Sequence, residues 1–316
     1  MRKGLWTLLL ILACLALASA QTTRDAKHMV PTGKGWGVES TTGATVNPYT
    51  VTLGNGISYH GGPIMSGNPV NVYFIWYGNW TNGPRPSDSQ VTVGLLDALF
   101  GSSGGMGGSG YARINTTYGS TSANVSGNMA LAASTTDAYS HGKRLSDSGV
   151  QAVVSSAISS GRLPRDTNGV YFVLTSSDVR ETSGFCTRYC GWHTHGTISG
   201  SDIKYSFVGN PDRCPSACEM QTVSPNGDSG ADGMASIMAH EAEETTSDPD
   251  LNAWYDSSGA ENADKCAWRF GPTTGSIGNG AYNETFGTHH WLIQMNWENS
   301  RGGGCDQTLG GTFYTN

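Results

Sequence analysis

The chain has 316 residues, of which only 14% are charged, and its formal net charge is −7. This acidic balance and the lack of a basic patch in the sequence argue against nucleic acid as a partner. The length leaves room for one large domain or two small ones.

The first twenty residues have the pattern of a secretory signal peptide. Arg2 and Lys3 give a basic start, residues 5–17 form an apolar stretch, and Ala18-Ser19-Ala20 forms a small-residue cleavage site. The apolar stretch is too short to span a bilayer well, and no other run approaches about 20 apolar residues. We therefore expect a secreted protein without a transmembrane segment.

Residues 21–56 lack apolar periodicity, so we expect a loose N-terminal arm there, followed by one domain over residues 57–316. Residues 68–77 form a β-branched and aromatic run that is typical of a buried central strand. Residues 170–175 form a second run of this kind.

Helices are predicted after Ser87 or Asp88, either of which can cap the first, and after Ser146, which can cap the second. In both segments apolar residues recur at helical spacing. The order strand, helix, helix, strand, helix predicts an α/β domain of mixed α+β content, in which helices pack on a twisted mixed sheet.

The stretch from Asp232 to Asp250 predicts a helix with both apolar and ionisable residues. At 3.6 residues per turn, His240 and Glu244 lie on one face, one turn apart. The pattern H-E-x-x-E differs by one residue from the H-E-x-x-H motif of zinc hydrolases, whose first glutamate is the general base. We therefore predict metal ligation by His240 and Glu244 and a catalytic role for Glu241, in a zincin-like arrangement.

A third metal ligand is expected from the acidic residues nearby, with Glu261 preferred and Asp264 or Asp248 as substitutes. A glutamate in place of the second histidine makes the ligand set harder, so zinc shares candidacy with manganese and calcium. One alternative is an all-oxygen calcium site that includes Asp228 and Asp232 and stabilises the fold. Another is the solvated end of an amphipathic helix that binds nothing. These patterns leave open whether the protein is an enzyme, and they do not indicate an oligomeric state.

His193, His195 and His60 are further candidates for the lining of the same cleft. His193 and His195 lie in Gly-Trp-His-Thr-His, close to two cysteines, and His60 lies in Tyr-His-Gly-Gly. The simpler interpretation, which we favour for His193 and His195, is that loop histidines hydrogen-bond to the backbone.

Six cysteines remain after removal of the signal peptide, and an even number in an exported chain predicts disulfide bonds. Their C-x-x-x-C spacing suggests two small local loops, which leaves a third pair; the three are Cys186 with Cys190, Cys214 with Cys218, and Cys266 with Cys305. A zinc site of four thiolates is the alternative, which the oxidising secretory route disfavours.

Four sequons predict N-linked glycosylation on export, at Asn79, Asn115, Asn124 and Asn283. Together with the cysteines, they describe a disulfide-stapled extracellular glycoprotein.

Several longer strings resemble the phosphate-induced protein 1 family, also called EXORDIUM-like proteins. They include YHGGPIMSGNPVNVYFIWYGNW at 59–80, LPRDTNGVYFVLTSSDV at 163–179, FCTRYCGWH at 185–193 and ENADKC at 261–266. The resemblance covers about residues 57–305, follows the family's order and includes all six cysteines.

This resemblance implies an apoplastic or wall-associated protein linked to cell expansion and growth under hormonal or nutrient control. It brings no established catalytic activity. Three functions are therefore expected from the residues. One is metal-dependent hydrolysis of a peptide or ester. The second is non-catalytic binding of an extracellular matrix or cell-wall protein or glycan, or signalling, with a structural or relict metal site. The third is a disulfide-stapled structural glycoprotein with no small-molecule site.

Overall fold

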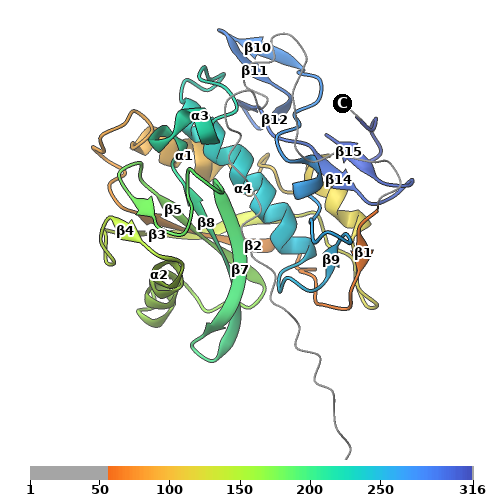
Figure 1. The fold of residues 1–316 in the computed structure, drawn as a ribbon, viewed down its shortest axis with the longest axis horizontal. Coiled ribbons are helices and arrows are strands. Elements are labelled where there is room, and N and C mark those ends of the chain that lie inside the picture. The colour runs from red at the N-terminus through yellow and green to blue at the C-terminus, as the bar shows by residue number, and fades with distance from the viewer. Residues whose placement is uncertain (1–55, 315–316) are drawn as a thin grey trace, which may run out of the picture.

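A five-stranded sheet forms the centre of the computed structural model, which describes residues 56–314. Its strand order is β3-β2-β5-β8-β7 (Figure 1). The first four strands are parallel, and β7 pairs antiparallel with β8 at the edge. The strands are β2 (Val70–Tyr77), β3 (Met129–Asp137), β5 (Gly169–Thr175), β7 (Gly191–Ile198) and β8 (Ser201–Gly209). The predicted mixed sheet is confirmed.

The two apolar runs of the sequence form adjacent strands in the middle of this sheet. All residues of β5 are buried, and in β2 only Asn71 is half-buried. Parallel strands buried on both faces need a continuous apolar sequence, because neither face meets water. This is why the two runs do not alternate between apolar and polar residues.

Helices cover both faces of the sheet. They are α1 (Gln90–Leu99), α2 (Asp147–Ser159) and α4 (Ser229–Ser247). The connection from β2 through α1 to β3 crosses the sheet in one direction along the strand order. The connection from β3 through α2 to β5 crosses it in the opposite direction. Because such crossovers are right-handed, α1 and α2 lie on opposite faces. Helix α4 packs beside α1 and against β7 and β8 (Figure 1).

The cap of α2 was predicted correctly, but that of α1 was not. Ser146 accepts a hydrogen bond from the Gly149 N–H at the start of α2. Helix α1 is capped by Ser89, not by Ser87 or Asp88. Those two side chains are buried in a polar network behind the cap, where they hydrogen-bond to neighbouring loops instead of to the helix.

Helix α4 is buried along almost its whole length, including its acidic end. Asp228 caps it by accepting a hydrogen bond from the Ala231 N–H, and every residue from 230 to 247 is buried. Its last backbone bond runs from the Asp248 N–H to the Glu244 carbonyl, and Pro249 prevents continuation. The alternative of a solvated amphipathic end is therefore wrong.

Most of the remaining chain forms short two-stranded antiparallel sheets. They are β1 (Ser58–Tyr59) with β9 (Trp254–Tyr255), β10 (Gly275–Ile277) with β11 (Gly280–Tyr282), β12 (Glu284–Phe286) with β13 (His289–Trp291), and β14 (Asn296–Glu298) with β15 (Gly304–Asp306). Short pieces complete the fold: η1 (Ala112–Thr117), β4 (Arg144–Leu145), β6 (Arg180–Glu181), η2 (Pro211–Arg213), α3 (Pro215–Cys218) and η3 (Asp264–Cys266). A second, smaller core around Trp297 and the Cys266–Cys305 disulfide supports them.

All six cysteines form disulfides, but two of the predicted pairings are wrong. The bonds are Cys186–Cys214, Cys190–Cys218 and Cys266–Cys305. The first two join the segment before β7 to the segment after β8, because antiparallel pairing places the start of β7 beside the end of β8. The third pairing is confirmed.

The sequons divide into exposed and buried sites. Asn124 is exposed and Asn79 is half-buried. The Asn115 and Asn283 amides are buried and donate hydrogen bonds within the fold, so the folded domain has no room for a glycan on either. The expectation of glycosylation is wrong for these two sites.

The predicted signal peptide and all but the last residue of the predicted arm lie outside the described residues. Within the described part, no helix is both long and apolar enough to cross a membrane.

Peptide mapping without reduction tests the disulfide pairing. Trypsin cleaves after Arg188 and Arg213 and so separates Cys186, Cys190 and the Cys214/Cys218 segment. We expect both peptides 181–188 and 189–204 to be joined to the peptide that begins at Cys214. A direct bond between peptides 181–188 and 189–204 would show the local loops instead.

Candidate metal centre

A buried group of ionisable side chains lies where α4 faces the edge strand β7. Helix α4 supplies His240, Glu241 and Glu244, and β7 supplies His193; all four side chains are fully buried. Residues four apart on a helix share a face, which places His240 and Glu244 together as predicted. His193 joins them because antiparallel pairing with β8 holds β7 directly beside α4.

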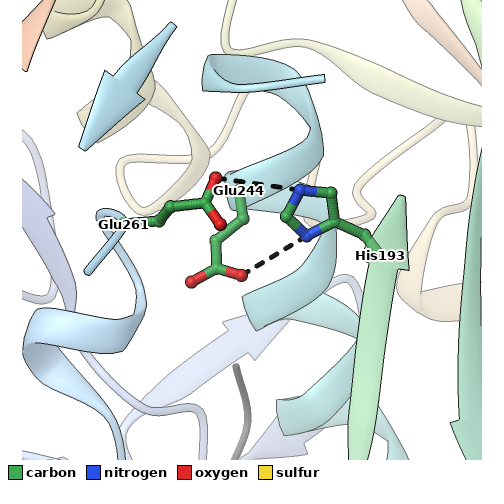
Figure 2. A group of neighbouring side chains, drawn as sticks. All are labelled: His193, Glu244 and Glu261. Carbon is green, nitrogen blue, oxygen red and sulfur yellow. Dashed lines mark ion pairs between the residues drawn. The ribbon is translucent and has the colours of Figure 1, made fainter. Parts of the chain in front are cut away.

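His193 lies between carboxylates on both sides of its ring. Its Nδ1 is 3.4 Å from Glu241 Oε2 and 3.4 Å from Glu244 Oε2, and its Nε2 is 3.8 Å from Glu261 Oε1. Figure 2 shows the imidazole from β7 between Glu244 of α4 and Glu261 of the following loop. The simpler interpretation, a loop histidine bonded to backbone, is therefore wrong for His193.

The segment from Glu261 to Asp264 is docked onto α4 by its own backbone. The Asp264 N–H donates to Glu244 Oε1 at 3.0 Å, and the Glu261 N–H donates to Asp264 Oδ2 at 3.2 Å. Both predicted acidic ligands thus reach the cluster. Asp264 Oδ1 lies 3.7 Å from His240 Nε2, on the opposite side of Glu244 from His193.

Gln294 fixes the orientation of His240. Its Nε2 donates to the Ala263 carbonyl at 3.1 Å and lies 2.8 Å from His240 Nδ1, while its Oε1 accepts from the Trp268 N–H. Since this amide nitrogen can only donate, it fits the neutral form of His240, in which Nδ1 accepts and Nε2 carries the proton toward Glu244 Oε1, 3.1 Å away. Metal ligation by His240 Nε2 would require this amide to turn over, whereas His193 needs no such change.

The electrostatics of the two histidines follow from their neighbours. Burial lowers the pKa of His193, but hydrogen bonds and charge from Glu241 and Glu244 outweigh it and raise the pKa to about 10. Burial likewise lowers the pKa of His240, and Glu244, Glu241 and Asp264 raise it to about 9. Burial raises the pKa of Glu241, against the lowering effect of both histidines.

The other predicted ligands lie elsewhere. Asp248 accepts hydrogen bonds from the Asn252 and Ala253 N–H groups at 2.6 and 2.5 Å and shapes the turn after α4. Asp228 caps α4, and Asp232 accepts from Asn226 Nδ2 at 2.7 Å, two turns before His240. The all-oxygen calcium site built on these residues is therefore wrong.

Two of the three candidate cleft histidines also lie outside the cluster. His60 is exposed and stacks on Tyr255, with ring centroids 3.7 Å apart. His195 lies farther along the same face of β7, where its Nδ1 is 2.8 Å from Asp202 Oδ1 and 3.7 Å from Asp250 Oδ1. Lys204 forms an ion pair with each of these two acidic groups.

A buried amide network behind the cluster was not predicted. The Asn115 amide donates to the Glu243 carbonyl at 2.6 Å and to Thr246 Oγ1 at 2.8 Å, and its oxygen accepts from Asn262 and Asn296. These side chains come from segments far apart in the sequence, so no local spacing could reveal them. Asn115 therefore holds three segments to the last turns of α4.

Replacing Asn115 tests this network against an exposed sequon. We expect Asn115→Ala to lower the free energy of unfolding by roughly 2–3 kcal/mol, because it leaves buried donors and acceptors without partners. Asn124→Ala removes an exposed sequon and serves as the control, with an expected change within about 0.5 kcal/mol. Chemical denaturation measures both; equal effects would contradict the network.

Asp232 gives a pH test away from the cluster. Burial raises the pKa of this carboxyl to about 7, so the folded protein holds a proton that the unfolded chain releases near its ordinary pKa. Stability should fall as the pH rises from about 4 to about 7 and then level off. Asp232→Asn should remove this slope, worth up to roughly 4 kcal/mol, in denaturation curves across this range. A parallel slope in both proteins would contradict the assignment.

Comparison with known proteins identifies the family. The model of the phosphate-induced protein 1 conserved region matches residues 57–290. Protein EXORDIUM-like 3 of Arabidopsis thaliana is 31% identical over 275 residues, which cover 76% of this chain and 80% of that protein. Protein EXORDIUM of the same plant is 29% identical over 253 residues, 72% of this chain and 75% of the relative.

Protein EXORDIUM-like 5, also of Arabidopsis thaliana, is 35% identical over 219 residues, which cover 63% of this chain. The match spans 59% of that relative's own length. No solved structure matches the chain. A family model over most of the domain and a relative aligned along most of both chains show that this chain belongs to the phosphate-induced protein 1 family.

Proposed function

We propose that this protein works outside the cell and holds one divalent metal ion between His193, Glu244 and Glu261. The observation that carries the proposal is geometric: each of these residues offers one ligand atom, and the three atoms lie within 4.8 Å of one another. All three side chains are fully buried. They come from β7, α4 and the loop before η3, so a shared ion would tie together three segments of the fold.

The charge of the cluster supports a cation. Glu241, Glu244, Glu261 and Asp264 carry up to four negative charges, against at most two positive charges on the two imidazoles. Burying a charge is costly unless a partner compensates for it. A divalent ion between the proposed ligands would add positive charge to this acidic cluster.

The donor set indicates which ions to test. One imidazole nitrogen with two or more carboxylate oxygens suits zinc and manganese. Calcium is also a candidate, because most of these ligand atoms are oxygens. Complete burial favours a stabilising ion, because substrate and water reach a catalytic metal through an open coordination position.

Metal-dependent hydrolysis of a peptide or ester is the second candidate, and one residue favours it. Glu241 is fully buried; His193 Nδ1 lies 3.4 Å from its Oε2, and within the described residues no donor reaches its Oε1. Unsatisfied buried carboxylates are costly and concentrate at functional sites. In this function Glu241 would take the proton from a water molecule next to the ligands.

Family membership supplies the setting of the proposal. By resemblance to EXORDIUM-like proteins, we infer an extracellular or wall-associated role in growth, with a matrix or cell-wall protein or glycan as partner. The predicted signal peptide and the three disulfides agree with this setting.

Elemental analysis of the secreted protein tests the centre. We expect about one zinc, manganese or calcium ion per chain, lost in His193→Ala and in Glu244→Ala. Adding the ion back to chelated wild-type protein should stabilise it by roughly 2.7 kcal/mol at 100 times the Kd. His195→Ala changes a histidine on the same strand and should keep the ion. Metal-free wild-type protein that no added ion stabilises would refute the centre.

Glu241→Gln separates the two functions. A hydrolase should keep metal and fold but lose turnover in a screen of peptide and ester substrates, because glutamine cannot accept the proton. A stabilising centre should show no turnover in either protein. Retained hydrolysis in the glutamine variant would rule out Glu241 as the base.

A further inference from the structure

The carboxyl ends of the parallel strands carry a second feature, on a different part of the fold from the metal centre. In the strand order of the sheet, the chain leaves β2 toward β3, on one flank of the β2–β5 pair. It leaves β5 toward β7 and β8, on the other flank. In open α/β sheets, ligands bind in the crevice outside the carboxyl ends where the connections diverge in this way. Here that point lies between β2 and β5.

Two cavities that share Cys186 and Arg213 lie at this edge. The larger, of about 400 Å³, is lined by Arg85 from the loop after β2, Ser177 and Asp178 from the loop after β5, and Arg213 from the segment after β8. The smaller, of about 190 Å³, adds Arg180 and two threonines, Thr182 and Thr187. Because they share Cys186 and Arg213, the cavities adjoin one another, and we refer to them together as the depression.

The depression is positively charged on a protein of net negative charge. Arg85, Arg180 and Arg213 are all exposed, and among the described residues none of them makes an ion pair. Two acidic groups also line it: Asp178 pairs with Lys143 at 2.7 Å, and the buried Glu181 accepts a hydrogen bond from the Ser183 N–H at 2.9 Å. Three guanidinium groups therefore remain available to an anionic ligand.

The walls of the depression are held in place. Arg213 Nη1 donates to the Ser177 carbonyl at 3.1 Å, and the Ser177 N–H donates to buried Asp88 at 2.7 Å. The bonds Cys186–Cys214 and Cys190–Cys218 cross-link the loops on either side. A site fixed in advance loses little entropy when it binds.

We propose that this depression binds an acidic oligosaccharide, whose carboxylates pair with Arg85, Arg180 and Arg213. Guanidinium groups bind carboxylates through two parallel hydrogen bonds. The hydroxyl groups of Thr182 and Thr187 and the carboxylate of Asp178 match the hydroxyl groups of a sugar. Two cavities in a row fit successive sugar units better than a single small anion. The site is independent of the metal centre.

Calorimetric titration of the full secreted chain with trigalacturonate tests the proposal, in the presence of a chelator so that the metal centre plays no part. We expect binding that weakens with salt and is absent for the carboxyl-reduced form of the same trisaccharide. Arg85→Gln and Arg213→Gln should each weaken binding roughly tenfold, because each removes a charged hydrogen-bond donor.

Arg165→Gln is the matched control. Arg165 is an exposed arginine at the opposite edge of the sheet, where it donates to the Ser199 carbonyl at 3.0 Å. Its replacement should leave binding unchanged. Arg85 makes no ion pair within the described residues, so loss of binding in Arg85→Gln would not follow from a broken contact in the fold. Four outcomes would each overturn the proposal. They are equal binding of the reduced trisaccharide, binding of inorganic phosphate in place of the trisaccharide, no binding, and an equal loss of binding in Arg165→Gln.

Discussion

The burial of four carboxylates and two imidazoles against one helix is the constraint on which the rest of this structure depends. A helix with the sequence of α4 cannot be buried unless its acidic end meets complementary groups. Strand β7 brings His193, Gln294 orients His240, and the backbone of the segment 261–264 donates to Glu244. The short hairpins after α4 and the Cys266–Cys305 disulfide hold that segment in place.

The candidate metal centre and the positively charged depression draw on different parts of the same sheet. Edge strand β7 and helix α4 supply the buried ionisable cluster, whereas the loops after β2, β5 and β8 line the depression at the carboxyl edge. Both depend on the reversal of direction at β7. The antiparallel return from β7 to β8 places His193 beside α4 and brings the two C-x-x-x-C segments together at the strand ends.

The H-E-x-x-E motif predicts where His240 lies, but it does not predict which ring nitrogen of His240 carries the proton. The spacing H-E-x-x-E places His240 and Glu244 one turn apart, as a zinc helix would. The amide of Gln294, however, gives His240 a proton on the nitrogen that faces Glu244. His193, assigned to a loop from the sequence, is the histidine whose ring faces carboxylates from three positions.

The sequence by itself determined the elements that depend on local pattern. Periodicity, capping chemistry and composition predict the two continuous apolar strands, the cap and apolar face of α2, and the helix that carries H-E-x-x-E. The acidic pair Glu261 and Asp264 was also expected near this helix. The family could also be recognised from the sequence, since its strings run in order along the chain.

Only the tertiary structure decided which distant groups meet. The crossed disulfides, the burial of Asn115 and Asn283, the entry of His193 into the cluster and the exclusion of Asp248 and His195 depend on strand order and on the packing of α4. Contacts between residues far apart in the chain carry no local periodicity. They arise when the sheet closes and each buried polar group takes the partner that the fold brings within reach.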